Sequence, residues 1–115
     1  MPYNRGDVLL ALYPDSNLRT AKRRPVLVVQ ADNLNTGLAQ TVVAMITSNL
    51  SRAGHPSRVS ISLATPDGQQ TGLKLHSVIM TDNMATIRDN EIDRKLGAWS
   101  DMAAVDSALR HTLGL

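Results

Sequence analysis

Short apolar runs separated by polar segments dominate the first half of the chain. Residues 7–13 (DVLLALY), 25–30 (PVLVVQ) and 41–47 (TVVAMIT) are rich in aliphatic residues and shorter than most helices. We therefore expect three strands, each buried on at least one face. The polar segment 14–24 between the first two strands predicts a surface loop of the kind that often carries function.

The second half of the chain shows a clearer period of two. Residues 58–63 (RVSISL) alternate polar and apolar, which predicts a half-exposed strand. Proline, glycine and polar residues over 65–72 indicate a turn. Residues 77–82 (SVIMTD) predict the next strand, and residues 84–87 (MATI) begin a further short one.

Two helical segments are also expected. Asp32 is a candidate cap for a single helical turn that ends near Gly37. Ser100 is a candidate N-cap for a C-terminal helix, with Asp101 in its first turn, where the helix dipole favours an acid. Apolar residues then recur at three- and four-residue steps and predict a helix lying on the sheet: Met102, Val105, Leu109 and Leu113.

These elements favour one domain over residues 1–115, because this length is about one domain's worth of chain and no repeat or linker divides it. Five or six short, mostly antiparallel strands and one late helix indicate a mainly β fold with a C-terminal helix, in the α+β class. The expected architecture is a small barrel or a twisted sheet with a helical lid.

Composition narrows the function only slightly. The chain has no cysteine, which excludes disulfides and thiol nucleophiles. No apolar run approaches the roughly 18 residues of a membrane span, and no signal peptide is recognisable, so we expect a cytoplasmic protein without a membrane partner. Cations gather early: seven Lys and Arg stand against three acids in residues 1–60, and five against seven in residues 61–115.

Three cations stand directly before a strand that looks suited to a core. Lys22, Arg23 and Arg24 precede Pro25 in the stretch AKRRPVLVVQ. Proline can begin a strand without losing a ladder hydrogen bond, and the arginines can simply solvate that end of the strand. The local pattern by itself favours this structural interpretation.

The order of several motifs changes this balance. RGDVLLALYPD, RRPVLVVQADNLN, VVAMITSN and SVIMTDNMATI, at these separations, resemble the MazF/PemK/Kid family of toxin endoribonucleases. The resemblance runs from about Arg5 through the terminal helix. It implies an SH3-like barrel, a homodimer, and cleavage of single-stranded RNA without metal or cofactor. It also implies a cognate acidic antitoxin, as in type II toxin–antitoxin systems.

The resemblance places the catalytic arginine at Arg24. Attack by a ribose 2′-hydroxyl adds negative charge to the scissile phosphate, and a guanidinium can meet it with two parallel hydrogen bonds. We expect the Thr47 hydroxyl to donate to a non-bridging phosphate oxygen, with Ser48 as a further catalytic candidate. The alternative is that both hydroxyls bond to nearby backbone and close a turn.

Further residues are expected to contact RNA: Arg19, Arg23, Arg52, His55, Arg58, Asp82 and Asn83. His55 could exchange protons near neutral pH, although an exposed loop histidine is the alternative. The general base and acid are not assigned, and His76 and His111 are expected to be structural or solvated. No metal is expected, because no spacing such as His-Glu-x-x-His occurs.

Aromatic residues are too few to predict a stacking platform for RNA bases. Only Tyr3, Tyr13 and Trp99 are aromatic, and single strands are usually held by stacking. Trp99 is expected to pack beside the terminal helix or to form part of a subunit contact. Recognition would then depend on hydrogen bonds from loops and on arginines that meet the RNA backbone.

The chain also departs from the family pattern at several positions. Arg19 stands where many members have an acid, Met80 where some have a further arginine, and Asn83 and Ala85 where a glutamine and an arginine are frequent. These departures leave Arg24 and Thr47 in place and bear on the cleavage sequence and the antitoxin contacts.

Two other functions are compatible with this kind of fold. One is a catalytically silent barrel that binds RNA or protein. The other is a gyrase-binding toxin like CcdB, whose relatives typically end in Trp-Gly-Ile, whereas this chain ends in HTLGL.

Overall fold

A computed structural model describes residues 3–115, so the first two residues of the predicted domain lie outside the described part. The expected class is confirmed: a mainly β fold with a C-terminal helix. No helix within residues 3–115 is long and apolar enough to cross a membrane. The elements in chain order are β1 (Asp7–Pro14), β2 (Ala21–Val28), β3 (Gln40–Thr47), β4 (Arg58–Ile61), α1 (Pro66–Gln69), β5 (Ser77–Arg88), the 3₁₀ turn η1 (Asp89–Glu91), β6 (Ile92–Ala98) and α2 (Met102–Leu113).

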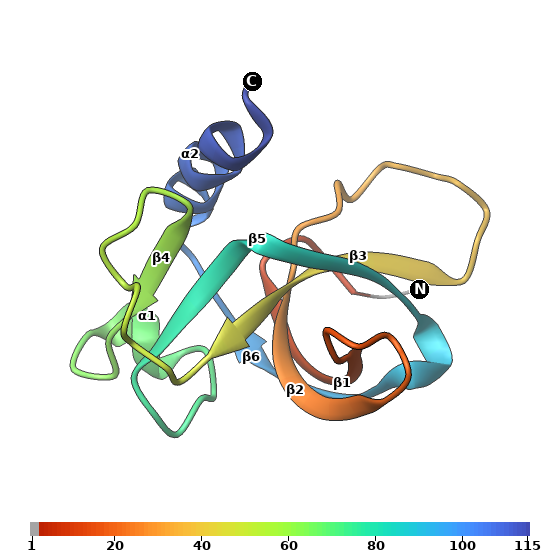
Figure 1. Cartoon of the computed structure of the whole chain (residues 1–115), viewed down its shortest axis with the longest axis horizontal. Helices are drawn as coiled ribbons and strands as arrows, with labels where there is room; N and C mark the ends of the chain where they lie inside the picture. The colour runs from red at the N-terminus through yellow and green to blue at the C-terminus, as the bar shows by residue number, and fades with distance from the viewer. Residues whose placement is uncertain (1–2) are drawn as a thin grey trace.

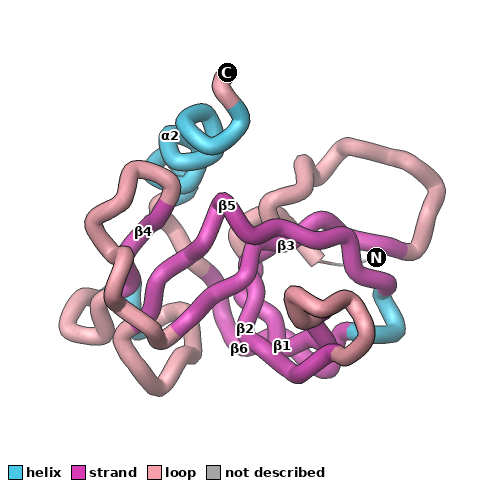
Figure 2. The backbone as a smooth tube through the Cα atoms, in the orientation of Figure 1, coloured by secondary structure: helices cyan, strands magenta, loops and turns pink. Residues whose placement is uncertain are grey.

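The six strands form one antiparallel sheet in the order β4-β5-β3-β2-β1-β6. The edge strands β4 and β6 do not pair with each other, so the expected barrel is not closed by hydrogen bonds. The sheet curls strongly instead, and α2 stands over β4 and the neighbouring part of β5 (Figure 1). Figure 2 shows β5 bending along its length where it crosses β3.

Both faces of the central strands are buried, which explains their continuous apolar runs. Val8, Leu27 and Ala44 point to one face and join a cluster with Trp99 and residues of α2. Their chain neighbours point to the other face, where the curled sheet encloses a second cluster: Leu9, Ala11, Tyr13, Val26, Val28, Val43 and Ile87. The strands expected at 7–13 and 41–47 are thus confirmed almost to the residue.

β2 begins earlier than expected, and this changes the setting of the cations. It starts at Ala21 rather than at Pro25, so Arg23 and Arg24 lie inside a strand that pairs with β1. The backbone of this exposed half is hydrogen-bonded even though its side chains point to solvent, which a hydrophobicity pattern does not reveal. Pairing with β3 begins only at Val26, after the proline, which has no N–H to donate.

The two short strands expected over 77–82 and 84–87 form one strand, β5, of 12 residues. Its pairing with β3 shifts abruptly: Ala44 faces Met84, whereas Met45 faces Met80. Residues 81–83 therefore bulge out of the ladder, and we call them the β5 bulge. Such a bulge bends the strand, and β5 pairs with β3 along one edge and with β4 along the other.

Three elements were not expected from the sequence: β6, α1 and the 3₁₀ turn η1. β6 carries Asp93, Arg94 and Lys95 on an exposed edge, so it lacks a clear apolar alternation. The turn expected over 65–72 contains the one-turn helix α1, capped by the Thr65 side chain, which accepts from the Gly68 N–H. The strand expected at 58–63 ends at Ile61.

The helical expectations need three corrections. Residues 31–39 contain no helix, because the Asp32 carboxylate accepts from the Arg5 backbone N–H at 2.7 Å instead of capping its own segment. The N-cap of α2 is Asp101 rather than Ser100, and its side chain accepts from the Ala104 N–H at 3.2 Å. Leu113 does not belong to the buried stripe, because α2 projects beyond the sheet there and Leu113 is 54% exposed (Figure 1).

A close backbone approach fixes the segment after α1 against β6. The Ala98 N–H donates to the Gln70 carbonyl at 3.0 Å, and a Cβ on the adjacent Gly97 would overlap with the carbonyl groups of Gln70 and Thr71. This contact anchors the start of the loop that continues to Lys74 and Leu75.

Gly97→Ala should lower the free energy of unfolding by about 1–3 kcal/mol, the usual cost of overpacking, because the neighbouring atoms are backbone and cannot turn aside. Urea denaturation measures this change. Gly54→Ala is the matched control, since a Cβ there meets nothing within 4 Å. Equal effects of the two substitutions would contradict the close contact.

Candidate active site

Strand register brings Arg24 and Thr47 together. Val26 pairs with Met45, and the same antiparallel register continued by two residues sets Arg24 opposite Thr47. Directly opposed residues on neighbouring strands project to the same face, so the two side chains meet where β2 and β3 diverge. Together with Ser48 they line a pocket of about 280 Å³, whose other lining residues are Arg23, Pro25, Ile46, Leu73, Lys74, Leu75 and Ser77.

Two further pockets adjoin this one. A pocket of about 520 Å³ also contains Arg24 and is completed by Asp15, Ser16, Asn17, Thr20, Lys22, Met45 and Asn83. A pocket of about 280 Å³ also contains Thr47 and is completed by Met45, Asn49, Ser51, Arg52, Arg58 and Met80. The three pockets meet around Arg24, Met45 and Thr47, and we call them together the groove.

Arg24 is held by a carboxylate from the loop between β1 and β2. Its Nη2 atom lies 3.3 Å from Asp15 Oδ1, and Asp15 also accepts from the Thr20 hydroxyl at 2.6 Å. The Thr20 hydrogen bond, followed by the hydrogen bond and charge of Arg24, lowers the pKa of Asp15. Asp15 is therefore ionised at neutral pH, and it orients a guanidinium whose side chain is still 34% exposed.

Arg58 makes a two-pronged ion pair with the β5 bulge. Its Nε and Nη2 atoms lie 2.8 and 3.1 Å from the two carboxylate oxygens of Asp82. The hydrogen bond from Arg58 lowers the pKa of Asp82, so the pair is intact at neutral pH. Much of the positive charge of Arg58 is thus already compensated within the protein.

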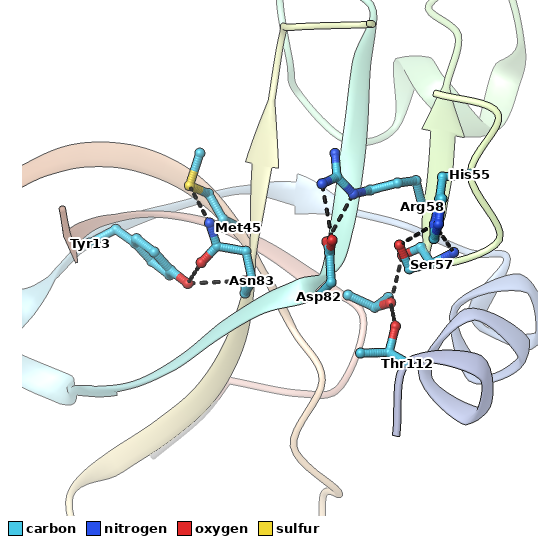
Figure 3. Close-up of polar contacts among 9 residues, drawn as sticks. Tyr13, Met45, His55, Ser57, Arg58, Asp82, Asn83 and Thr112 are labelled. Atoms are coloured by element: carbon cyan, nitrogen blue, oxygen red, sulfur yellow. Dashed lines mark hydrogen bonds and ion pairs between the residues drawn. The ribbon is translucent and has the colours of Figure 1, made fainter. Parts of the chain in front are cut away.

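Each residue of the β5 bulge is held by a different part of the fold (Figure 3). Thr81 is fully buried and donates to the Ser57 carbonyl at 2.6 Å, and its hydroxyl also lies 2.8 Å from that of Thr112 in α2. Asp82 pairs with Arg58 of β4, and Asn83 contacts Tyr13 of β1. The bulge therefore connects the groove to α2 and to both halves of the sheet.

Four of the expected RNA-binding residues line the groove, and three do not: Asp82, Arg19 and His55. Arg23, Arg52, Arg58 and Asn83 line the groove together with the three catalytic candidates. Asp82 lines none of the three pockets and is linked to the groove through its ion pair with Arg58. Arg19 lies in the exposed loop after β1, where its backbone N–H donates to the Asn17 side chain at 2.9 Å.

His55 lies away from the groove, against α2. Its Nδ1 atom accepts from the Ser57 N–H at 3.1 Å, and its ring meets His111 edge to face with centroids 5.9 Å apart. His76 accepts from the Leu63 N–H at 3.0 Å. Among the described residues, no histidine lines the groove, and no three His, Asp or Glu side chains are grouped to hold a metal.

Several groove residues were not identified from the sequence. Asp15 stands in a polar loop like many exposed acids, and only the folded hairpin shows that it meets Arg24. Lys74 lies in a turn segment remote from the motifs, in the loop that follows the contact of Gln70 with β6. Met45 could have been found, because strand alternation sets it on the same face as Thr47.

The Arg58–Asp82 pair predicts a pH-dependent contribution to stability. A lowered pKa for Asp82 means that its contribution is present above its ordinary pKa of 3.8 and is lost as the pH falls through the lowered value. Asp82→Asn should therefore destabilise the protein near neutral pH, and the difference from wild type should shrink below about pH 4.

Denaturant unfolding between pH 7 and pH 2.5 measures this difference. Arg58→Gln should behave like Asp82→Asn, and Asp67→Asn is the control for removing one carboxylate that has no ion pair among the described residues. A difference that stays constant across this pH range would show that the pair is not the cause.

Comparison with known proteins shows the family to which the chain belongs. The chain is 35% identical to endoribonuclease MazF2 of Mycobacterium bovis and to endoribonuclease MazF6 of Mycobacterium tuberculosis, over the full length of each chain. It matches the solved structure of a mycobacterial endoribonuclease in complex with its cognate antitoxin with a TM-score of 0.73 and 24% identity, covering 98% of this chain and 96% of the other. The pattern of the PemK-like, MazF-like toxins of type II toxin–antitoxin systems matches residues 4–113, and the chain belongs to this family.

Proposed function

We propose that this chain is the RNA-cleaving toxin of its system and that cleavage takes place in the groove, at Arg24 and Thr47. The observation that carries the proposal is their shared pocket, in which a cation and a hydroxyl from opposed strands converge beside Ser48. The proposed substrate is single-stranded RNA. The curated relatives of similar sequence are endoribonucleases, which supports the same reaction class.

In the proposed reaction the ribose 2′-oxygen attacks the adjacent phosphorus, and the bond to the 5′-oxygen of the next nucleotide breaks. The 2′-hydroxyl loses its proton and the departing 5′-oxygen gains one, leaving a 2′,3′-cyclic phosphate and a 5′-hydroxyl. The phosphorane-like transition state carries extra negative charge on its non-bridging oxygens. Arg24 meets this charge with two N–H donors, and Thr47 donates a third hydrogen bond from the opposite strand.

The charge distribution suggests how the RNA backbone is held. Three groove cations have no carboxylate within 4.0 Å among the described residues: Arg23 and Lys74, in the pocket shared by Arg24 and Thr47, and Arg52, in the pocket shared by Thr47 and Met80. These side chains are available to phosphates on both sides of the cleavage point, whereas Arg58 is engaged by Asp82. RNA binding should therefore weaken as the salt concentration rises, because these contacts release counterions from the RNA when it binds.

Arg24→Lys and Thr47→Val should each lower kcat by about 10²-fold or more, because each removes a donor that acts on charge developing in the transition state. Lysine keeps the charge of Arg24 but not its fork. The measurement is cleavage of a long RNA in excess chelator, with mapping of the cut ends and detection of cyclic phosphate.

Arg94→Ala, which removes a cation from the exposed edge strand β6, should leave the rate within about twofold of wild type, as surface changes usually do. Equal rates for wild type and both groove variants would reject the site. Loss of activity on removal of divalent metal would reject the mechanism.

We further propose that an acidic antitoxin covers the groove, that the toxin is a homodimer, and that it acts in the cytoplasm. One matching structure is an endoribonuclease in complex with its cognate antitoxin, which supports a proteinaceous inhibitor here. A disordered acidic segment with a few apolar anchors fits a groove with unpaired cations beside Leu73 and Leu75.

A purified acidic partner encoded beside this chain should inhibit RNA cleavage in step with complex formation. Its affinity should fall between 50 and 300 mM salt, because exposed charges are screened over about 8 Å at physiological ionic strength. Arg23→Ala and Lys74→Ala should reduce this salt dependence. A saturated complex that still cuts RNA at the full rate would refute occlusion.

A further inference from the structure

Two methionines lie side by side in the groove next to Thr47. Met45 of β3 pairs directly with Met80 of β5, and Met80 pairs in turn with Arg58 of β4, so the three side chains form a row across the sheet. Both methionines are half-buried and line the same pocket. Since Met45 is two residues from Thr47 on one strand, it projects to the same face about 7 Å away. We call Met45 and Met80 the methionine floor.

The Met45 side chain is contacted by Asn83, which is itself hydrogen-bonded to Tyr13. The Asn83 amide nitrogen donates to Met45 Sδ at 3.7 Å, and the Asn83 amide oxygen lies 2.6 Å from the Tyr13 hydroxyl (Figure 3). Tyr13 is 3% exposed, and burial raises its pKa, so the phenol keeps its proton and donates to Asn83. The β5 bulge thus orients the Met45 thioether through Asn83.

The groove has no aromatic side chain among the described residues. Tyr13 and Trp99 are buried in the two cores, and Tyr3 lines a different pocket beside the β2–β3 loop. A thioether is polarizable and makes favourable contacts with aromatic rings. Nucleobases are aromatic, and every base offers a π-face. The methionine floor therefore offers a polarizable surface for a base in a groove that lacks an aromatic stacking platform.

The surroundings of the floor fit a nucleotide rather than a purely apolar ligand. Asn49, Ser51 and Arg52 complete the same pocket with hydrogen-bonding groups and one unpaired cation. A base lying on the thioethers can offer its edge to the amide and hydroxyl, while Arg52 reaches the adjoining phosphate. Arg58, paired with Asp82, also lines this pocket.

We propose that Met45 and Met80 form the floor of a nucleobase subsite one nucleotide from the scissile phosphate, with Asn83 and Tyr13 as positioning residues. The inference rests on the proposed RNA cleavage and extends it to the recognition of a neighbouring base. Recognition by a thioether surface tolerates different bases, so selection among bases would come from Asn49 and Ser51 at the base edge.

The experiment combines protein variants with abasic RNA. Once the cut site is mapped, short RNA substrates are made in which one base flanking the cut is replaced by an abasic ribose. Met80→Ala should lower kcat/KM about five- to tenfold on the intact RNA, from the lost contact with one ring. On the RNA that lacks the base at the subsite, wild type and Met80→Ala should cleave equally.

Tyr13→Phe tests the positioning role, because it removes only the hydroxyl that orients Asn83. It should raise KM on the intact RNA more than it lowers kcat, and the loss should vanish on the same abasic RNA. Met102→Ala, a half-buried methionine of α2, is the matched control and should lower kcat/KM equally on both RNAs, if at all. Thermal unfolding of each variant checks that the fold is intact.

Binding of a fluorescent, 2′-O-methylated RNA separates this inference from the proposed function. One outcome is that Met80→Ala binds the methylated RNA more weakly only when the base at the subsite is present, while wild type does not cleave the unmethylated RNA. This outcome would support the floor and reject the proposed function. A second outcome is that wild type cleaves RNA but Met80→Ala lowers kcat/KM by the same factor on intact RNA and on every abasic RNA. This outcome would reject the floor and leave the proposed function standing. RNA neither bound nor cut would contradict both.

Discussion

The pairing of β2 between β1 and β3 is the constraint on which the site depends. One half of β2 is cationic and the other half is core, and a single antiparallel register holds both. Val26 and Val28 pack in one buried cluster and Leu27 in the other, and this sets the register, because a one-residue slip would exchange side chains between two differently filled clusters. With the register fixed, Thr47 lies opposite Arg24 where β2 and β3 diverge, and both line one pocket.

The β5 bulge is the second determinant, because it connects the groove to the rest of the molecule. Its three residues are held by β4, by α2 and by the buried Tyr13, and none of these contacts needs a ligand. Polar groups fixed in this way are oriented before binding, which lowers the cost of ordering them later. The groove thus combines a rigid half, around the bulge, with three cations that have no carboxylate partner among residues 3–115: Arg23, Arg52 and Lys74.

Sequence patterns predicted the fold where side-chain burial decides the structure. The apolar runs of β1 and β3, the alternation of Val59 and Ile61, and the buried Trp99 all match the structure. Backbone pairing of exposed residues leaves no such pattern, so the early start of β2 and the charged edge strand β6 were missed. The motif order predicted which residues to examine at the site, and the structure brings Arg24, Thr47 and Ser48 together. The contact of Asp15 with Arg24 depends on the folded hairpin, and the pairing of Met45 with Met80 depends on the shift at the β5 bulge. No local pattern encodes either contact.

In the proposed reaction, Arg24 and Thr47 act on the same phosphate group. The most direct test is a double-mutant cycle on kcat/KM for RNA cleavage, with Arg24→Ala, Thr47→Val and the double variant. If both donors act as a unit on one transition state, kcat/KM of the double variant should be only slightly lower than that of the slower single variant. The reason is that the effects of residues that act as a unit do not add. Losses that multiply independently, or a Thr47→Val enzyme as fast as wild type, would contradict the claim.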